Sequence, residues 1–317
     1  MPGLLERLPR PLPAGLERVR PLDLVGLAPL MARSAGRPEV AVGLLDGLVA
    51  VGQPAFTGRR LHVLPGRPNA TGGPVCVTAG DGPCVHGSFV AGVLSADRAS
   101  PSPGICPDCT LLIRPVFAGH RADPPAAPAG RPTPLDASTE ELAAAVVQAV
   151  DAGARVLNLS VAPERPSSSG HRELTAALDH AAARGVLTVV AAGNQGRLGS
   201  SVLTRHPWTI PVVGYDGLRR PMELSNLGGS IGARGVGAPG QAVVHLDPAE
   251  RPLVLSGTSV AVPFVTGTLA LLLSCFPHAT PAEVRAAVLR GAARPSARRS
   301  VVPPLLDARA AYEHLRG

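Results

Sequence analysis

The sequence contains no lysine. All 30 of its basic residues are arginine, in a chain of 317 residues with a net charge of +7. Aromatic residues make up only 3% and are not interleaved with the arginines. Because single-stranded nucleic acids bind by stacking bases on aromatic side chains, this composition argues against a nucleic-acid partner. The bias toward arginine, alanine, glycine and proline indicates a GC-rich genome. We interpret the charge as scattered over the surface and leave a weak preference for acidic peptides open.

The sequence also lacks a long hydrophobic run. Residues 1–15 carry arginines and prolines but no continuous apolar stretch of signal-peptide length. The longest apolar run, Thr268 to Phe276, is too short to cross a bilayer and is typical of a buried helix. We therefore expect a cytoplasmic protein without a membrane partner. The sequence does not indicate its oligomeric state.

Cysteine is scarce, and its number is odd. An odd count in a chain expected to stay inside the cell argues against a full disulfide framework. Four of the five cysteines cluster, and one pair has Cys-x-x-Cys spacing, so a zinc site or a disulfide pairing remains open. The alternative, which we favour, is reduced and partly buried thiols. The candidate ligands are Cys76, Cys84, Cys106 and Cys109, and the fifth cysteine is Cys275.

The hydrophobic pattern predicts an α/β protein with a mostly parallel sheet covered by helices on both faces. Hydrophobic residues make up 45% of the chain, enough to bury a sizeable core. Strands are expected at Glu39 to Leu45, Thr110 to Phe117, Arg155 to Ser160 and Val186 to Ala192. Capping residues predict helices at Leu142 to Val150, Arg172 to Arg184 and Ala282 to Leu289, with a last helix at Leu306 to Leu315.

The chain divides into an N-terminal extension, residues 1–38, and one domain, residues 39–317. Two stretches near residues 51–82 and 119–134 are rich in turn residues and are expected to form long loops. Long loops in compact domains often border a functional site, although a tolerated insertion explains the first one equally well.

Residues able to form a nucleophilic site occur in separate segments. Ser259 lies in the segment LSGTSVAVP, residues 255–263, at the start of an apolar helix. A serine hydroxyl is a weak nucleophile and needs a base within hydrogen-bond reach. His86, in HGSFVAG at residues 86–92, is the candidate base. Asp46 ends an expected strand in VGLLDG at residues 42–47, where α/β proteins place their chemistry.

These segments, with VVAAGN at residues 189–194, resemble the boxes of the subtilisin-like serine peptidases in their order Asp, His, Ser. The resemblance implies the three-layer subtilisin-like fold, with residues 39–317 as the peptidase domain. It also implies a catalytic triad of Asp46, His86 and Ser259, and an oxyanion hole formed by Asn194 and the Ser259 N–H. This chemistry requires no cofactor, and whether calcium or zinc binds is unknown. The implied substrate-binding residues are Asn158, Ser160, Ala162, Ala192 and Gly193.

Pro263 lies inside the expected helix, four residues after the candidate nucleophile. Proline has no N–H to donate to the carbonyl of Ser259. An ordinary helix avoids proline at such a position. Gly257 likewise allows the backbone to turn tightly beside the serine.

Three departures from the family pattern stand out. Gly47 follows the aspartate directly where the family usually has serine or threonine, and Ser88-Phe89 replaces threonine and a second histidine. Ala162-Pro163 stands where a glycine pair is usual, which predicts a narrowed specificity pocket. The boxes and the segment ICPDCTLL, residues 105–112, most resemble cyanobactin maturation proteases. This resemblance implies a peptide or protein substrate, in particular the precursor of a modified natural product whose leader is removed.

Each of these residues also has an ordinary structural explanation. Asp46 could end a strand, His86 could cap a helix, Asn194 could belong to a turn and Ser259 could be an N-cap. Joint occurrence in four boxes favours the triad. A catalytically silent module that binds a peptide in a biosynthetic complex is the alternative. A redox protein built on the Cys-x-x-Cys pair lacks partner motifs. An ester hydrolase of the α/β-hydrolase class requires Gly-x-Ser-x-Gly and the order Ser, acid, His, and we expect neither in this chain.

Overall fold

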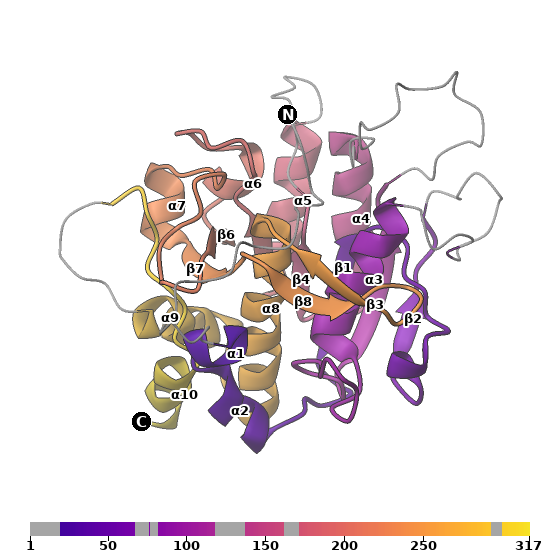
Figure 1. Cartoon of the computed structure of the whole chain (residues 1–317). Coiled ribbons are helices and arrows are strands. Elements are labelled where there is room, and N and C mark those ends of the chain that lie inside the picture. The colour runs from indigo at the N-terminus through magenta and orange to yellow at the C-terminus, as the bar shows by residue number, and fades with distance from the viewer. Residues whose placement is uncertain (1–19, 67–75, 77–81, 118–136, 162–170, 293–299) are drawn as a thin grey trace.

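The computed structural model describes residues 20–66, 76, 82–117, 137–161, 171–292 and 300–317. Parallel strands form one seven-stranded sheet in the order β2-β3-β1-β4-β5-β6-β7 (Figure 1). The bounds are β1 Ala41–Asp46, β2 Leu61–Val63, β3 Thr110–Pro115, β4 Val156–Leu159, β5 Leu187–Ala191, β6 Thr209–Tyr215 and β7 Val236–Pro239. An antiparallel hairpin follows, formed by β8 Val243–Leu246 and β9 Pro252–Leu255.

The predicted parallel sheet and its four predicted strands are confirmed, as are the four predicted helices. Ser138 caps α4 by accepting from the Glu141 N–H, and Thr280 with Glu283 forms a reciprocal capping box at α9. The α-helices are α1 Pro21–Leu24, α2 Leu27–Arg33, α3 Gly82–Ser95, α4 Thr139–Asp151, α5 His171–Ala183, α6 Val202–Arg205, α7 Gly229–Arg234, α8 Thr258–Cys275, α9 Pro281–Gly291 and α10 Ala308–Arg316. A short 3₁₀ helix covers Pro54–Phe56.

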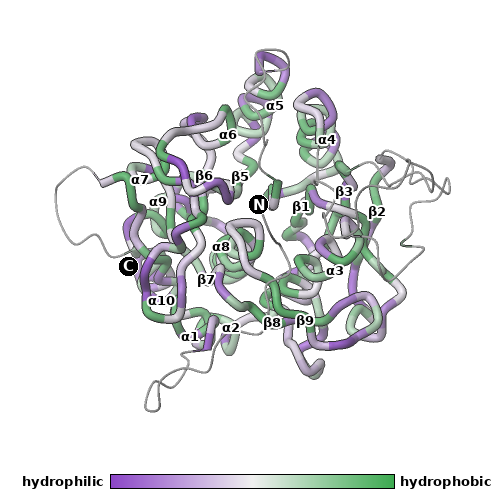
Figure 2. The backbone as a smooth tube through the Cα atoms, turned by 45° about the horizontal axis from the view of Figure 1, so that its top comes forward, coloured by the Kyte–Doolittle hydropathy of each residue, from purple (hydrophilic) through white to green (hydrophobic). Residues whose placement is uncertain are grey.

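Side-chain alternation along the strands divides the core between the two faces of the sheet. In β1, Val42 and Leu44 pack with α3 and α8, whereas Leu45 packs with α4 and α5. In β4, Val156 likewise joins α8 and Leu157 joins α4. Figure 2 shows hydrophobic residues concentrated in the strands and in α8. The protein is therefore a three-layer α/β/α structure.

Helix α8 is the central element of one helical layer. It contacts strands β4 to β7, and 94% of it is buried inside the protein. Its 18 residues and mean hydropathy of 1.7 would also suit a membrane span. We expected no apolar segment long enough to span a membrane. This expectation was wrong about length, because the apolar segment begins at Thr258 rather than Thr268. The burial identifies α8 as a core helix.

The expected boundary between an N-terminal extension and a domain at residue 39 is wrong for the described residues. Leu27 and Leu30 of α2 are buried in the main core, which also contains Leu306 and Ala311, and α2 contacts α10. Residues 20–38 therefore belong to the same folded unit. The expected loop at residues 51–82 contains both the 3₁₀ helix and strand β2, which pairs with β3.

Strand β1 lies where the strand order changes direction. Strands β2 and β3 lie on one side of it, and β4 to β7 lie on the other. In open α/β sheets, ligands bind at the carboxyl ends of strands at such a point. Asp46 is the last residue of β1. The topology therefore directs attention to this end of the sheet.

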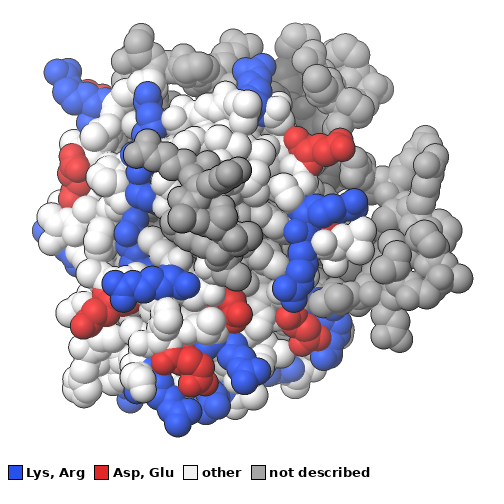
Figure 3. Space-filling view, turned by 90° about the vertical axis from the view of Figure 1, so that its left-hand side faces the viewer, with Lys and Arg blue, Asp and Glu red and all other residues white. Residues whose placement is uncertain are grey.

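Charged side chains do not gather by sign on the face shown in Figure 3, where acidic residues lie among the arginines. Ion pairs also occur in the described part of the chain. Arg220 pairs with Asp216 and Arg251 pairs with Asp247, each four residues apart. This face fits the interpretation of scattered charge.

A buried histidine links the hairpin to helix α3. His245 of β8 is 4% exposed, and its ring meets Phe89 edge-on at 5.8 Å between centres. A methyl group at Gly92 would lie 2.3 Å from His245 Cε1, so only glycine lets the ring sit against the helix. Burial lowers the pKa of His245 to about 4 from its ordinary 6.5.

We expect the free energy of unfolding to fall as the pH drops from 6.5 toward 4. The pKa of folded His245 lies below that of the unfolded chain, so the stabilisation is complete above 6.5 and is lost as the unfolded chain takes up the proton. A shift of this size corresponds to about 3 kcal/mol. Denaturant unfolding at both ends of this window should show that wild type loses about this much more than His245→Asn. Equal losses would contradict the assignment.

Candidate active site

The structure brings the three predicted triad side chains into one hydrogen-bonded line. His86 Nδ1 lies 2.7 Å from Asp46 Oδ1, and His86 Nε2 lies 3.0 Å from Ser259 Oγ. The three residues are 0%, 3% and 7% exposed for Asp46, His86 and Ser259. Both distances are within ordinary hydrogen-bonding range. The imidazole is therefore placed to receive a proton from the serine while the carboxylate fixes its other nitrogen.

Glycines allow α3 to approach the end of β1 closely enough for this contact. A Cβ at Gly47 would lie 1.8 Å from the Pro83 carbonyl oxygen, and one at Gly87 would lie 2.4 Å from that of Leu48. Neither position has space for a side chain. The departure from the family pattern at Gly47 thus follows from packing, because a serine or threonine there would push α3 and His86 away from Asp46.

The carboxylate of Asp46 is held on one side only. Its Oδ1 accepts from the Gly47 N–H at 2.6 Å as well as from His86. Its Oδ2 is buried and has no hydrogen-bond partner in the described part of the chain. Residue 47 is a glycine and has no hydroxyl to donate to Oδ2. Both hydrogen bonds to this carboxylate therefore go to Oδ1, the oxygen that faces the imidazole.

Two opposing effects set the pKa of His86. Burial favours the neutral ring, but the charge of Asp46 and its hydrogen bond favour the protonated ring and outweigh burial. The pKa of His86 is therefore raised above its ordinary value of 6.5. A ring with this pKa can take up the serine proton and later return it to a leaving group.

The nucleophile lies in the first turn of α8. Gly257 is the N-cap, Thr258 begins the helix, and Ser259 is the second helical residue rather than the N-cap. The N–H groups of the first turn have no acceptor within the helix, so that of Ser259 can bind a developing negative charge. A Cβ at Gly257 would lie 3.5 Å from Ser259 Oγ and 3.2 Å from Asn194 Nδ2. Glycine thus leaves open the space that the amide and the nucleophile share.

The amide of Asn194 is oriented by the start of the same helix. Asn194 Oδ1 accepts from the Thr258 N–H at 2.9 Å and from Thr258 Oγ1 at 3.0 Å. Thr258 Oγ1 in turn accepts from the Gly193 N–H at 3.1 Å. Because the amide oxygen is engaged, its NH₂ group is the end that faces the space beside Gly257, as an oxyanion donor requires.

The expected substrate-binding residues fall into three groups. Ala192 and Gly193 lie at the end of β5 beside Asn194. The side chains of Asn158 and Ser160 are 0% and 5% exposed, and their polar groups hydrogen-bond within the fold. A direct contact of these two side chains with substrate stays a prediction. Ala162, and with it the narrowed pocket, lies outside the described residues.

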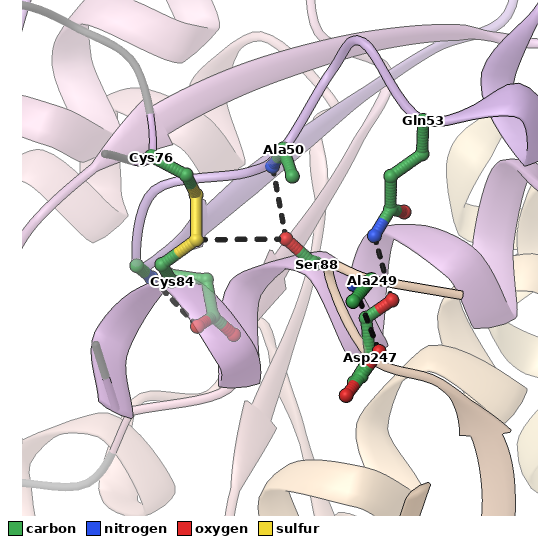
Figure 4. The surroundings of a disulfide bond; sticks show 9 residues. Ala50, Gln53, Cys76, Cys84, Ser88, Asp247 and Ala249 are labelled. Carbon is green, nitrogen blue, oxygen red and sulfur yellow. Dashed lines mark hydrogen bonds between the residues drawn. A yellow bond between two sulfur atoms is a disulfide. The ribbon is translucent and has the colours of Figure 1, made fainter. Parts of the chain in front are cut away.

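The cysteines contradict the expectation of reduced thiols at two positions. Cys76 and Cys84 form a disulfide, so their sulfurs cannot act as zinc ligands (Figure 4). Cys106 and Cys109 are buried free thiols. Among the described residues no group of three or more histidine, cysteine or acidic side chains can hold a metal. Two of the four candidate ligands are therefore paired with each other in this structure.

The disulfide fixes the first turn of α3, two residues before His86 (Figure 4). The next turn is held by Ser88, whose Oγ accepts from the Ala50 N–H at 2.9 Å. The segment that follows Ala50 contacts the β8–β9 hairpin through the Gln53 side chain, which donates to the Asp247 carbonyl at 2.7 Å. The first two turns of the helix that carries His86 are thus held by the disulfide and by the Ser88 hydrogen bond.

One serine pattern was missed in the sequence. GGSIG at residues 228–232 fits Gly-x-Ser-x-Gly, a pattern that presents nucleophiles in other hydrolases. Its Ser230 Oγ is buried without a hydrogen-bond partner in the part of the chain that the structure covers. Without a base, Ser230 is not an activated nucleophile.

The α/β/α fold and the hydrogen-bonded Asp, His and Ser define a serine hydrolase whose site lies at the carboxyl ends of a parallel sheet. The chain belongs to the subtilase family, Peptidase S8, whose sequence profile matches residues 81–310. It is a subtilisin-like serine endopeptidase. The matched region includes His86 and Ser259, whereas Asp46 precedes it.

Curated relatives include subtilisin DY of Bacillus licheniformis, 30% identical over 209 residues that cover 63% of this chain and 67% of the relative. Mycosin-1 of Mycobacterium tuberculosis is 30% identical over 268 residues, which cover 68% of this chain and 58% of the relative. The chain therefore spans little more than half the length of mycosin-1.

Solved structures extend the likeness over nearly the whole chain. The prenylagaramide maturation protease PagA is 30% identical, with a TM-score of 0.77, and covers 92% of this chain and 98% of its own. The patellamide maturation protease PatA is 29% identical, with a TM-score of 0.71, and covers 89% and 98%. The PatG macrocyclase in complex with a peptide is 22% identical, with a TM-score of 0.76, over 95% and 99%, and shows the shared fold alone.

The Asp46→Asn variant should react at Ser259 about 10⁴-fold more slowly, because the imidazole loses its orienting partner. The pKa of His86 should also fall, since burial then acts without the opposing carboxylate charge. The rate of serine modification measured against pH checks both effects. Wild type should lose activity as the pH falls through a midpoint above 6.5, where the base becomes protonated. An unchanged midpoint in the variant would contradict the proposed coupling.

Breaking the disulfide should destabilise the protein by about 2.5 kcal/mol, the loop-closure value for a separation of 8 residues. Cys76→Ser and reduction of wild type should give the same loss in denaturant unfolding, and the reductant should not affect Cys76→Ser further. Cys275→Ser, which removes a free thiol, is the matched control. Unfolding of Cys76→Ser at the wild-type denaturant concentration would show that the bond does not stabilise the fold.

Proposed function

We propose that Ser259 is the nucleophile that attacks a scissile peptide carbonyl, with His86 as general base and Asp46 as the residue that orients it. The observation that carries the proposal is the continuous line of hydrogen bonds at 2.7 Å and 3.0 Å. His86 Nε2 takes the Ser259 proton as the new C–O bond forms, and then donates it to the leaving amine. Water subsequently attacks the acyl-enzyme with His86 again acting as base.

The oxyanion formed in each step requires donors that are already in place. Asn194 Nδ2 and the Ser259 N–H supply two, and Asn194 Nδ2 and Ser259 Oγ lie beside the open position at Gly257. Loss of one such donor costs about 10² to 10³ in rate in related chemistry. Because Thr258 holds the amide oxygen of Asn194, the donor does not have to reorient when charge develops.

For the substrate we propose a ribosomally made precursor peptide from which a leader is removed. The support is the likeness at 29% to 30% identity to the maturation proteases PagA and PatA over almost the full length of both chains. Such precursors are synthesised in the cytoplasm, which is the proposed location of the reaction. The Cys76–Cys84 bond is the feature that argues against this location, because reducing compartments disfavour disulfides.

A fluorophosphonate probe should label wild type and not Ser259→Ala, because labelling requires a serine activated by its base. Ser230→Ala should label like wild type, since Ser230 has no partner in the described structure. Failure to label wild type would support the catalytically silent, peptide-binding alternative.

The substrate proposal predicts narrow cleavage specificity. Digestion of a defined peptide mixture, followed by mass spectrometry, should yield cuts within a small set of related sequences, all absent with Ser259→Ala. Unfolded casein, offered in parallel, should remain largely intact. Extensive digestion of casein would contradict a dedicated precursor protease while leaving the serine mechanism in place.

A further inference from the structure

A proline inside α8 removes a hydrogen bond from the backbone of the nucleophile. In a regular helix the Ser259 carbonyl accepts the N–H of the residue four positions later, which here is Pro263. Both residues are buried. The carbonyl needs another donor.

Strand β4 supplies that donor. Ser160, the residue directly after β4, places its Oγ 3.0 Å from the Ser259 carbonyl oxygen and donates to it. The two residues are 99 positions apart in the chain. A side chain from the sheet thus replaces the helical hydrogen bond that Pro263 removes.

A buried relay fixes the direction of this hydroxyl. Asn158 Nδ2 donates to Ser160 Oγ at 2.8 Å, which leaves the single Ser160 proton to point at Ser259. Thr266 Oγ1 donates to Asn158 Oδ1 at 2.9 Å and thereby sets the amide orientation. Thr266 and Asn158 are both fully buried. The relay begins on α8, passes through β4 and returns to α8 on the other side of Pro263.

The placement of this relay follows from the strand pattern. Val156, Asn158 and Ser160 alternate with Leu157 and Leu159, so the two polar residues share the face of β4 that packs against α8. Leu159 pairs with Leu45, and the residues that follow them directly are Ser160 and Asp46 respectively. Neighbouring strands therefore hold the acid and the donor to the nucleophile's backbone.

We propose that Ser160 and Asn158 are positioning residues for the nucleophile, and that the relay from Thr266 fixes the backbone of Ser259 so that its Oγ stays within reach of His86. This inference rests on the proposed role of Ser259 as nucleophile. The relay is uncharged, so it sets the position of the serine without altering the charge around His86. Loss of the relay should slow the attack by Ser259 and leave unchanged the pH midpoint that His86 sets for this reaction.

The test compares rates of fluorophosphonate labelling of Ser259 and thermal unfolding midpoints across a set of variants. Ser160→Ala should label about 10- to 100-fold more slowly, the effect expected for a misplaced reacting group. Its pH midpoint should equal that of wild type. Ser274→Ala is the matched control, because it also removes a buried hydroxyl that donates to a carbonyl of α8, that of Ala270 at 2.7 Å. It should lower the unfolding midpoint without slowing the labelling.

Rescue separates positioning from general damage. Pro263→Ala restores a backbone N–H for the Ser259 carbonyl, so the double variant Ser160→Ala/Pro263→Ala should recover at least part of the labelling rate. Pro263→Ala alone should not accelerate labelling, because in this variant Ser160 still donates a hydrogen bond to the Ser259 carbonyl. If the double variant does not fold, Thr266→Val tests the relay from its far end, and should slow labelling several-fold with no shift of the pH midpoint.

Three results would overturn the inference: Ser160→Ala labelling at the wild-type rate, a slowing no greater than that of Ser274→Ala, or a folded double variant no faster than Ser160→Ala. An unaltered rate in Thr266→Val would equally exclude the relay. Failure of wild type itself to label would instead refute the proposed role of Ser259, so the two failures are distinguishable.

Discussion

The hydrogen bond of 3.0 Å between His86 and Ser259 joins two helices that reach the sheet from separate parts of the chain. Neither side chain is useful alone, because the serine needs a base and the base needs a fixed direction. The bond forms only if α3 and α8 both start at the carboxyl ends of the strands and remain there within a few tenths of an ångström. Much of the local structure around the site serves this one requirement.

Three neighbouring strands contribute to it in different ways. β1 ends in Asp46, which holds the imidazole. β4 ends before Ser160, which bonds to the carbonyl of the nucleophile, and β5 leads to Asn194, which bonds to Thr258 at the start of α8. A rigid parallel sheet thus sets the relative positions of base, nucleophile and oxyanion donor. Gly47 and Gly87 let α3 lie close to the segment that follows β1, and the Cys76–Cys84 bond ties the first turn of α3 to Cys76.

Strands β1, β3, β4 and β5 could be predicted because each is a mostly apolar run, as is typical of parallel strands buried on both faces. Strands β6 and β7 were missed because they contain Pro211, Gly214 and Gly237, which local patterns assign to turns. Tertiary packing explains at least one of them. A Cβ at Gly237 would lie 2.2 Å from the Tyr215 ring, so glycine is needed where the aromatic side chain covers the neighbouring strand.

At the site, the order and spacing of the boxes predicted which side chains meet, because those segments carry the residue types that acyl transfer needs. The roles of Asn158 and Ser160 could not be read in the same way. In the sequence, a polar residue at the end of a strand that faces a cleft cannot be distinguished from one that faces a helix. Only the position of α8 shows that Asn158 and Ser160 face a helix. The missing donor at Pro263 was visible in the sequence, whereas the residue that replaces it lies 99 positions from Ser259.

The central claim is that the site is arranged in advance for a negatively charged tetrahedral oxygen beside Ser259. A crystal structure of the protein after reaction with a fluorophosphonate tests this directly, since the bound phosphonyl group mimics that tetrahedral centre. The account predicts phosphorus on Ser259 Oγ with one oxygen about 2.7 to 3.1 Å from both Asn194 Nδ2 and the Ser259 N–H. Asn194 should still be bound to Thr258. A phosphonyl oxygen turned away from Asn194, or a modification on another serine, would contradict it.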